Sequence, residues 1–181
     1  SFFFFFYGEL LFLAKKYNEG RAVFQKVTKD FPKTEDASRA YYQQGLHEQV
    51  DLKAYETALN FYDSSYIARP PSKWGKESKE RYDALKRLLV LQSNNDAMDS
   101  LAQSSKPFFD NEFQIAELFL FKLSESDSAV ARLNGIIENS DDSLKVFLNT
   151  KGQKGEVSRE LKAFLNFVEE STVQNAANIN V

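Results

Sequence analysis

The chain has no cysteine among its 181 residues, and it has one histidine, one methionine and one tryptophan. The absence of cysteine excludes disulfides, cysteine–zinc sites and thiol nucleophiles. His47 alone cannot form a metal site with two histidines, and a serine–histidine–acid triad would depend entirely on this residue. Glycine-rich phosphate loops and dinucleotide-binding fingerprints are also missing. We therefore expect no cofactor, no metal and no enzymatic activity.

Turn-forming residues are scarce, with 7 glycines and 4 prolines. A many-stranded sandwich or barrel needs far more of them. Hydrophobic residues make up 43% of the chain and charged residues 27%, which is typical of a folded protein. These absences predict an all-α fold in which short turns join the helices.

Charge of one sign is also lacking, because 26 acidic residues stand against 23 basic ones and the net charge is −3. A chain with this balance is not expected to bind nucleic acid as a whole. One segment, 73–93, gathers basic residues beside Trp74 and Tyr82, a pattern that also suits anionic lipid or nucleic acid. The interleaved acids favour a solvated helix crossed by ion pairs instead; they are Glu77, Glu80 and Asp83.

Adjacent carboxylates occur at several places, including Glu35-Asp36 and Asp141-Asp142. Most of them stand at predicted helix starts, where free N–H groups and the helix dipole favour negative charge. We interpret them as caps, with Thr34 or Asp36 capping the helix that follows, rather than as acid–base or calcium sites.

The longest apolar run opens the chain at Phe2–Tyr7 and continues through Leu13. Glu9 and the Lys15-Lys16 pair keep it shorter than the ~20 residues that a membrane span needs. We expect a helix over 2–16 that is buried on several sides, covered by a partner or by an upstream helix. Because the chain begins at Ser1 rather than methionine, we expect a processed or truncated product, with any membrane tether upstream of Ser1.

Apolar spacing and turn residues divide the rest of the chain. A turn is predicted at 17–20, and the next helix ends at Pro32. Further helices are predicted at 35–50, 53–68, 73–93, 111–123 and 126–139, with helical segments at 144–148 and 157–170. The predicted domains are a first array over 1–93, a connector over 94–110 and a second helical lobe over 111–181.

Part of this pattern repeats every 37–38 residues, which aligns Gly8 with Gly45 and Tyr17 with Tyr55. Antiparallel helices pack closely only where small residues face each other, and a large ring fills the space beside them. The small residues predicted to do this are Gly8, Gly45 and Ala116 on the first helices and Gly20, Ala58 and Ala129 on the second. The rings predicted to fill the space are Phe24 and Tyr62.

This pattern resembles the tetratricopeptide repeat, with Phe4, Gly8, Tyr17, Phe24 and Pro32 in the register of that family's consensus. The resemblance implies a solenoid of helix pairs, a right-handed α–α superhelix, with one divergent copy over 115–137.

The long spacing is similar to repeats of bacterial cell-envelope proteins, such as the lipoprotein of the outer-membrane β-barrel assembly machinery and the periplasmic partner of the Tol–Pal system. It implies a location in the bacterial periplasm or at the outer membrane, with the cytoplasm as the alternative.

In that family, the first helix of each pair lines a concave groove in which peptides dock. The resemblance therefore indicates Tyr42, Gln44 and His47 as groove residues, while Tyr41 is expected in the core and a purely structural role is the alternative for His47. The predicted function is a non-catalytic scaffold or adaptor that binds other proteins of a multi-subunit assembly. The alternatives are a structural subunit of a filament or large complex and, third, an enzyme that depends on His47.

Overall fold

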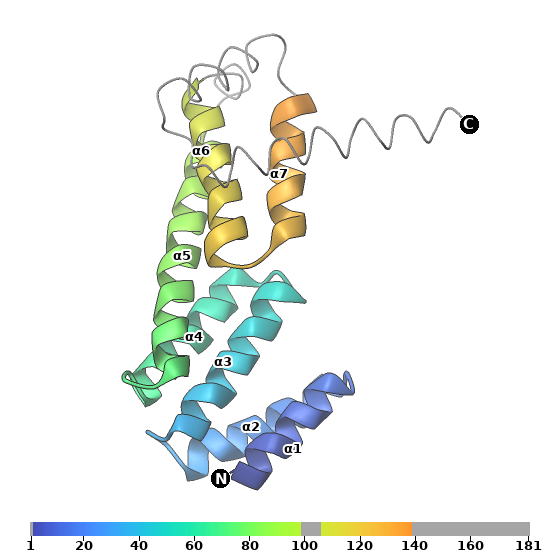
Figure 1. The fold of residues 1–181 in the computed structure, drawn as a ribbon, viewed down its shortest axis with the longest axis vertical. Helices are drawn as coiled ribbons and strands as arrows, with labels where there is room; N and C mark the ends of the chain where they lie inside the picture. The colour runs from blue at the N-terminus through green and yellow to red at the C-terminus, as the bar shows by residue number, and fades with distance from the viewer. Residues whose placement is uncertain (1, 99–105, 139–181) are drawn as a thin grey trace, which may run out of the picture. The chain divides into compact units, whose positions relative to one another are not determined.

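The computed structural model of the chain describes residues 2–98 and 106–138. In these ranges every regular element is helical, so the predicted all-α class is confirmed (Figure 1). The helices are α1 (Phe2–Leu13), α2 (Tyr17–Asp30), α3 (Glu35–Val50), α4 (Tyr55–Ala68), α5 (Lys73–Asp96), α6 (Lys106–Glu117), the π-helical turn η2 (Leu118–Lys122) and α7 (Ser126–Glu138).

The chain divides into two compact units, 1–90 and 91–181, and the boundary falls within α5. In the first unit, α1 packs against α2 and α3 against α4, while α2 also contacts α3. In the second unit, α6 and η2 pack against α7. Each unit thus contains helices paired with their neighbours in sequence, as short connections dictate.

The core of the first pair surrounds the Phe24 ring, which is fully buried. Phe5 stacks on it at 5.7 Å between ring centroids, and Phe12 lies at 5.0 Å. A Cβ placed on Gly8 would lie 2.5 Å from this ring, so only glycine allows α2 to approach α1 so closely. Gly20 likewise leaves room for the Phe12 ring, because a Cβ on Gly20 would lie 2.4 Å from it.

The second pair repeats this contact with a different ring. Tyr62 on α4 is fully buried, and a Cβ on Gly45 of α3 would lie 2.9 Å from it. The Tyr62 hydroxyl donates to Gln49 Oε1 at 2.7 Å. Farther along the same interface, Ser38 and Ser65 each donate a hydroxyl proton to the other's carbonyl oxygen. This core is therefore closed by buried hydrogen bonds as well as by apolar contact.

The turns inside the three helix pairs share one backbone feature, a residue with positive φ. These residues are Lys15 (59°), Lys53 (54°) and Ser124 (58°). Each stands five positions before a small residue on the second helix of its pair, namely Gly20, Ala58 and Ala129. Ala58, Ala116 and Ala129 are all buried. The third pair therefore makes its turn as the first two do, although its sequence is the most divergent.

Two hydroxyl caps start the longer helices. Thr34 Oγ1 accepts from the Ala37 backbone N–H at 3.2 Å, so Thr34 rather than Asp36 caps α3. Ser72 Oγ accepts from the Gly75 N–H at 3.0 Å and begins α5 in the same way. Gly75 is required there because a Cβ would lie 2.3 Å from the Arg69 carbonyl oxygen.

Three predictions are wrong. Residues 17–20 form the first turn of α2 instead of a turn, since the Gly20 N–H donates to the Lys16 carbonyl in helical fashion. Helices enter the predicted connector 94–110 from both sides, because α5 continues to Asp96 and α6 begins at Lys106. The first helix ends at Leu13 rather than at residue 16. Most of it faces outward in the single chain, so its expected burial against a partner or an upstream helix stays a prediction. The helical segments predicted at 144–148 and 157–170 lie outside the described residues.

Candidate partner-binding hollow

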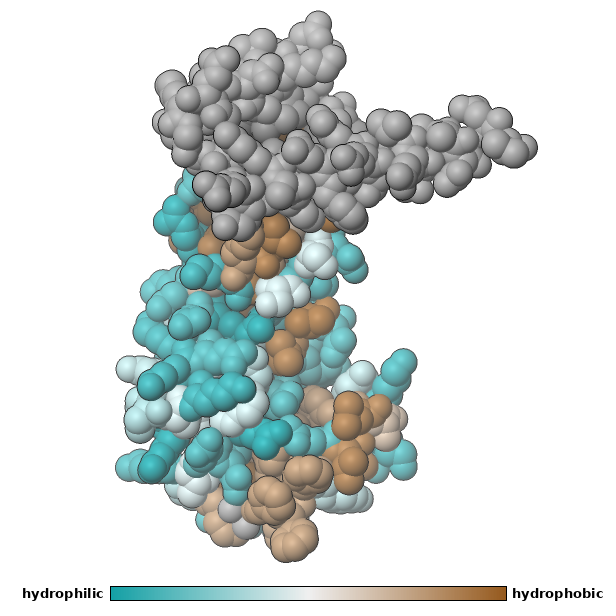
Figure 2. Space-filling model, viewed as in Figure 1, coloured by the Kyte–Doolittle hydropathy of each residue, from teal (hydrophilic) through white to brown (hydrophobic). Residues whose placement is uncertain are grey.

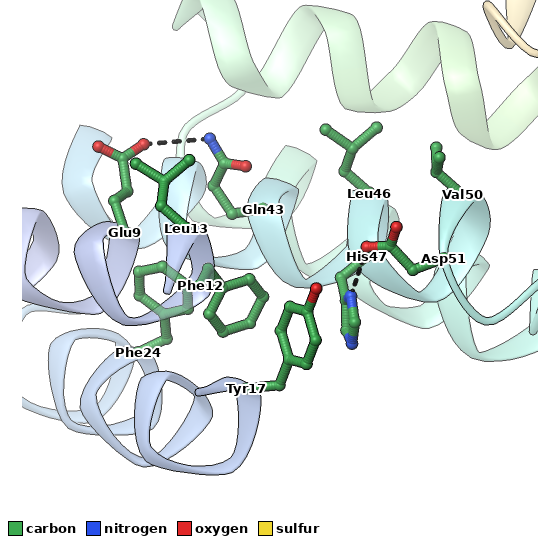
Figure 3. A pocket seen from close by; sticks show the side chains of 10 residues that line it. All are labelled: Glu9, Phe12, Leu13, Tyr17, Phe24, Gln43, Leu46, His47, Val50 and Asp51. Atoms are coloured by element: carbon green, nitrogen blue, oxygen red, sulfur yellow. Dashed lines mark hydrogen bonds and ion pairs between the residues drawn. The ribbon is translucent and has the colours of Figure 1, made fainter. Parts of the chain in front are cut away.

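A hollow of about 390 Å³ lies between α1, α2 and α3 in the first unit (Figure 3). Its apolar wall is made of aromatic and aliphatic side chains, and its polar groups stand among them. The lining residues are Glu9, Phe12, Leu13, Tyr17, Phe24, Gln43, Leu46, His47, Val50 and Asp51.

Helical spacing explains which residues reach the hollow. On α3 the lining positions Gln43, Leu46, His47 and Val50 follow the i, i+3, i+4, i+7 pattern, which places them on one face. On α1, the lining segment Glu9–Leu13 contributes its first, fourth and fifth residues by the same rule. Two helices that are not adjacent in sequence thus present one face each to the same space.

His47 lines the hollow and is 5% exposed. Its ring stacks on Tyr17 at 4.0 Å between centroids, and the edge of Phe12 lies 5.4 Å away. His47 Nδ1 is 2.6 Å from a carboxylate oxygen of Asp51, which stands at the C-terminal end of α3. Figure 3 shows the tyrosine and histidine rings next to each other, with the Asp51 carboxylate joined to the histidine by a dashed line.

A histidine–aspartate pair is a component of nucleophilic sites, but such a site also needs a nucleophile within hydrogen-bond reach. None of the residues that line the hollow is a serine, threonine, cysteine or lysine, and its two carboxylates are already paired, Glu9 with Arg39 and Asp51 with His47. Tyr17 stacks on His47 with an angle of 24° between the ring planes, which is a packing geometry. The arrangement fixes the histidine in place and offers carboxylate and ring surface to a bound molecule.

Glu9 forms the other polar side of the hollow. Arg39 Nη2 donates to both of its carboxylate oxygens, at 2.8 and 3.1 Å, and Gln43 Nε2 donates at 3.1 Å. The Arg39 guanidinium is itself held between the rings of Phe5 and Trp74, at 4.4 and 4.9 Å from their centroids. Glu9 is therefore held in position before anything binds.

The lining carries carboxylates as well as apolar groups, and one of them, Glu9, is already paired with Arg39 from outside the hollow. It contains the carboxylates of Glu9 and Asp51 and no lysine or arginine. The Asp51 side chain is 53% exposed, so it can accept further hydrogen bonds from a ligand. A molecule with an apolar group and a nearby positive charge suits this chemistry best.

The predicted groove residues fare differently. His47 lines the hollow, but Tyr42 and Gln44 are buried, each 4% exposed, and do not line it. Gln44 Nε2 donates back to the Ala40 carbonyl of its own helix at 3.2 Å. The prediction misses Gln43, which stands four positions before His47, and Leu46, which stands three positions after Gln43 on the same face.

Tyr42 is buried between α3 and α5, whereas Tyr41 was the tyrosine expected in the core. Its ring lies 5.1 Å from that of Trp74, and its hydroxyl donates to Glu77. Burial, together with this hydrogen bond to a carboxylate, raises the pKa of Tyr42 from 10.0 to about 12. Tyr41 is only half-buried.

The basic segment of α5 shows the ion pairs that its sequence favours. Lys79 Nζ is 2.6 Å from Asp83, and Arg81 Nε is 3.8 Å from Glu77. The Lys79 ammonium also lies 5.3 Å from the centroid of the Tyr82 ring. Lys79 and Arg81 are thus matched by acidic residues of the same helix.

Within residues 2–98 and 106–138, no three histidine or acidic side chains converge as metal ligands. None of the helices described is at once long enough and apolar enough to cross a bilayer. Comparison of the chain with protein-family models, with curated proteins and with solved structures gives no match.

Proposed function

We propose that this chain is a tetratricopeptide-like solenoid that acts as a non-catalytic scaffold, and that its hollow binds an extended segment of a partner protein. The segment carries a large apolar side chain beside a lysine or arginine. The single observation behind this proposal is the hollow itself, with apolar walls and fixed carboxylates on the first helices of two successive pairs.

The repeat geometry supports the solenoid. Gly8 against Phe24 and Gly45 against Tyr62 are the same contact in successive pairs, and the turns at Lys15 and Lys53 match. In a right-handed superhelix of such pairs, the first helices line the concave side. The hollow lies between α1 and α3, which are those helices.

The chemistry of the wall supports the kind of partner. Leu46 and Val50 provide aliphatic surface on α3, and Phe12 and Tyr17 provide rings on the opposite side. An apolar side chain inserted among them would leave water, while a neighbouring cation would reach Asp51 or Glu9. By the resemblance stated above, the partner belongs to a multi-subunit assembly at a bacterial cell envelope.

Selection from a library of random peptides tests this proposal. We expect the enriched peptides to combine a Leu, Phe or Trp with an adjacent Lys or Arg, and to bind at micromolar Kd. Leu46→Asp should weaken binding at least tenfold, because it places a charge in the apolar wall. Asp51→Asn should reduce both the preference for basic peptides and the salt dependence of binding.

Ile67→Asp is the matched control, since Ile67 is a 65% exposed aliphatic residue on α4 outside the hollow. It should leave peptide binding unchanged. Peptides that bind the Leu46→Asp variant as well as the original chain would show that the hollow is not the binding site.

A further inference from the structure

The outward face of α1 is a continuous apolar surface, which we call the α1 stripe. At 100° per residue its members fall within an arc of about 140°, on the side of the helix away from the buried Phe5 and Gly8. The stripe consists of Phe2, Phe3, Phe6, Tyr7, Leu10 and Leu13, which are 47–87% exposed. Figure 2 shows tan and brown side chains gathered over this end of the first unit.

The stripe is large enough to form an interface. With roughly 150–200 Å² for each fully exposed side chain, the exposed fractions leave about 600–800 Å² of mostly apolar surface in water. A typical monomer has no patch larger than about 300–600 Å². A specific interface buries about 800 Å² on each partner. The stripe alone therefore approaches the area that one side of a stable dimer contributes.

The charge pattern around the stripe indicates what covers it. The only charged residue of α1 is Glu9, whose carboxylate is held by Arg39 and Gln43 on the side of the hollow. A surface without charge has no means of selecting a partner by complementary charge, and it does not repel an identical surface. Helices that lie on anionic membranes carry Lys or Arg along the length of their apolar face, and α1 has none within its length. The nearby lysines are Lys15 and Lys16, which follow the end of α1, and Lys26, which lies 4.8 Å from the Phe4 ring outside the stripe.

The order of side chains along the stripe favours an antiparallel arrangement of two copies. Large rings occupy its N-terminal half, at Phe2, Phe3 and Phe6, and leucines occupy its C-terminal half, at Leu10 and Leu13. A two-fold axis near Tyr7 would set the rings of one helix against the leucines of the other, so that large side chains meet smaller ones. Parallel pairing would set rings against rings and leave gaps between the leucines.

From these observations we infer that a second copy of this chain covers the α1 stripe, so that the protein is a two-fold dimer through antiparallel α1 helices. This inference goes beyond the proposed function, because the hollow and the stripe have only Leu13 in common. Dimerisation and peptide binding can therefore fail separately.

Sedimentation equilibrium of the 181-residue chain tests the inference. Concentrations from about 0.5 to about 100 µM, a range of about 200-fold, bracket a Kd in the micromolar range. We expect a reversible monomer–dimer equilibrium with Kd in the micromolar range. The double variant Phe3→Glu/Leu10→Glu should raise Kd at least 100-fold, since it places like charges within the paired stripes. Ile67→Glu, which puts the same charge on an exposed aliphatic residue of α4, should leave Kd unchanged.

Cross-linking tests the direction of the helices, and the absence of native cysteine makes it clean. Tyr7→Cys, near the axis, should form a disulfide-linked dimer under mild oxidation. Leu13→Cys alone should not, but a mixture of Phe2→Cys and Leu13→Cys chains should form the mixed dimer. Self-linking of Leu13→Cys without the mixed product would overturn the antiparallel arrangement.

A chain that stays monomeric at 100 µM would overturn the inference, as would association that Phe3→Glu/Leu10→Glu leaves unchanged. Monomers that bind phosphatidylcholine–phosphatidylglycerol vesicles through α1 would overturn it in favour of a lipid surface. The variants change exposed side chains only, and circular dichroism shows whether they retain the helices. Peptide selection with the double variant separates the two proposals, because a monomer with an intact hollow should still bind peptide.

Discussion

The two helix pairs of the first unit use the same contact and differ in everything built around it. In α1–α2 a glycine faces Phe24, and in α3–α4 a glycine faces Tyr62. The first ring is surrounded by phenylalanines, whereas the second donates a hydrogen bond to Gln49. The same glycine–ring contact is thus compatible with an apolar core and with a core that contains a buried hydrogen bond.

The outer faces differ more strongly than the cores. The second pair is bound to α5 by buried polar contacts: Ser78 Oγ donates to Ser65 Oγ at 2.7 Å, and Arg81 donates to Gln49 at 3.2 Å. The outer face of α1 is apolar and is covered by nothing in the part of the chain that the structure describes. The glycine–ring contact thus forms each pair, while the outer faces decide what the pair binds next.

The largest effects should come from removing the two rings. Phe24→Ala should lower the free energy of unfolding by about 3–5 kcal/mol, since it empties a fully buried site. Tyr62→Ala should cost at least as much, because it also removes the hydrogen bond to Gln49. Urea unfolding followed by fluorescence measures this in the first unit alone, since Trp74 is the only tryptophan.

If the pairs are equivalent units, the free energy of unfolding of the two alanine variants should also fall with urea concentration at similar slopes. A cost below about 1 kcal/mol for Phe24→Ala would mean that the first pair is not packed around its ring as the second is.

Adding a methyl group at the glycines should have a smaller effect, and a different one in each pair. Alanine favours a helix over glycine by about 1 kcal/mol, but overpacking costs about 1–3 kcal/mol. A Cβ on Gly8 would meet the Phe24 ring at 2.5 Å, against 2.9 Å between Gly45 and Tyr62. We expect Gly8→Ala to destabilise by about 1–2 kcal/mol and Gly45→Ala by less than about 1 kcal/mol.

Gly135→Ala is the control for helix propensity, because a Cβ there would meet nothing within 4 Å. It should be neutral or stabilise α7 by up to about 1 kcal/mol, measured by circular dichroism. Equal destabilisation at all three glycines would contradict an explanation based on ring contact.

Much of the fold follows from the sequence because helix ends and small residues leave local signals. Glu35–Val50 is predicted to the residue, with Thr34 or Asp36 as its cap, of which the structure shows Thr34. The glycine–ring contacts follow from the repeat. The predicted start of the connector is wrong because the polar residues 94–96 continue α5. A tertiary contact supports the helix there, since Asn95 Nδ2 donates to Glu112 at 2.6 Å.

The candidate site is less predictable because its helices give no clear phase. The first helix is apolar on nearly every side, so its sequence does not show which face is outward. On α3, residues 41–44 are two tyrosines followed by two glutamines. Because the two tyrosines are equally polar, and so are the two glutamines, polarity does not show which member of each type is buried. Contacts with distant residues decide: Glu77 on α5 accepts from Tyr42, and Glu9 on α1 accepts from Gln43.

The smallest expected effect concerns the polar contact that binds α5 to the second pair, through Tyr42. The pKa of Tyr42 is about 12 in the folded chain, against 10.0 for an ordinary tyrosine. The folded state therefore holds this proton over a range of pH in which the unfolded state releases it. The contribution of this proton to the free energy of unfolding is fully present below pH 10. It falls as the pH rises from 10 towards 12, because the unfolded state binds fewer protons than the folded state in that range.

Tyr42→Phe should remove this part of the alkaline loss of stability, at a cost of about 1 kcal/mol at neutral pH, where Glu77 loses a hydrogen-bond donor. Urea unfolding at pH 8, 10 and 11, followed by Trp74 fluorescence, measures the difference between the two chains. Tyr7→Phe is the control, since Tyr7 is 54% exposed and its removal should leave the pH dependence unchanged. If Tyr42→Phe and the original chain lose stability equally between pH 10 and 11, the buried phenol does not hold its proton as the contact with Glu77 requires. The polar and apolar pairs would then differ less than their structures indicate.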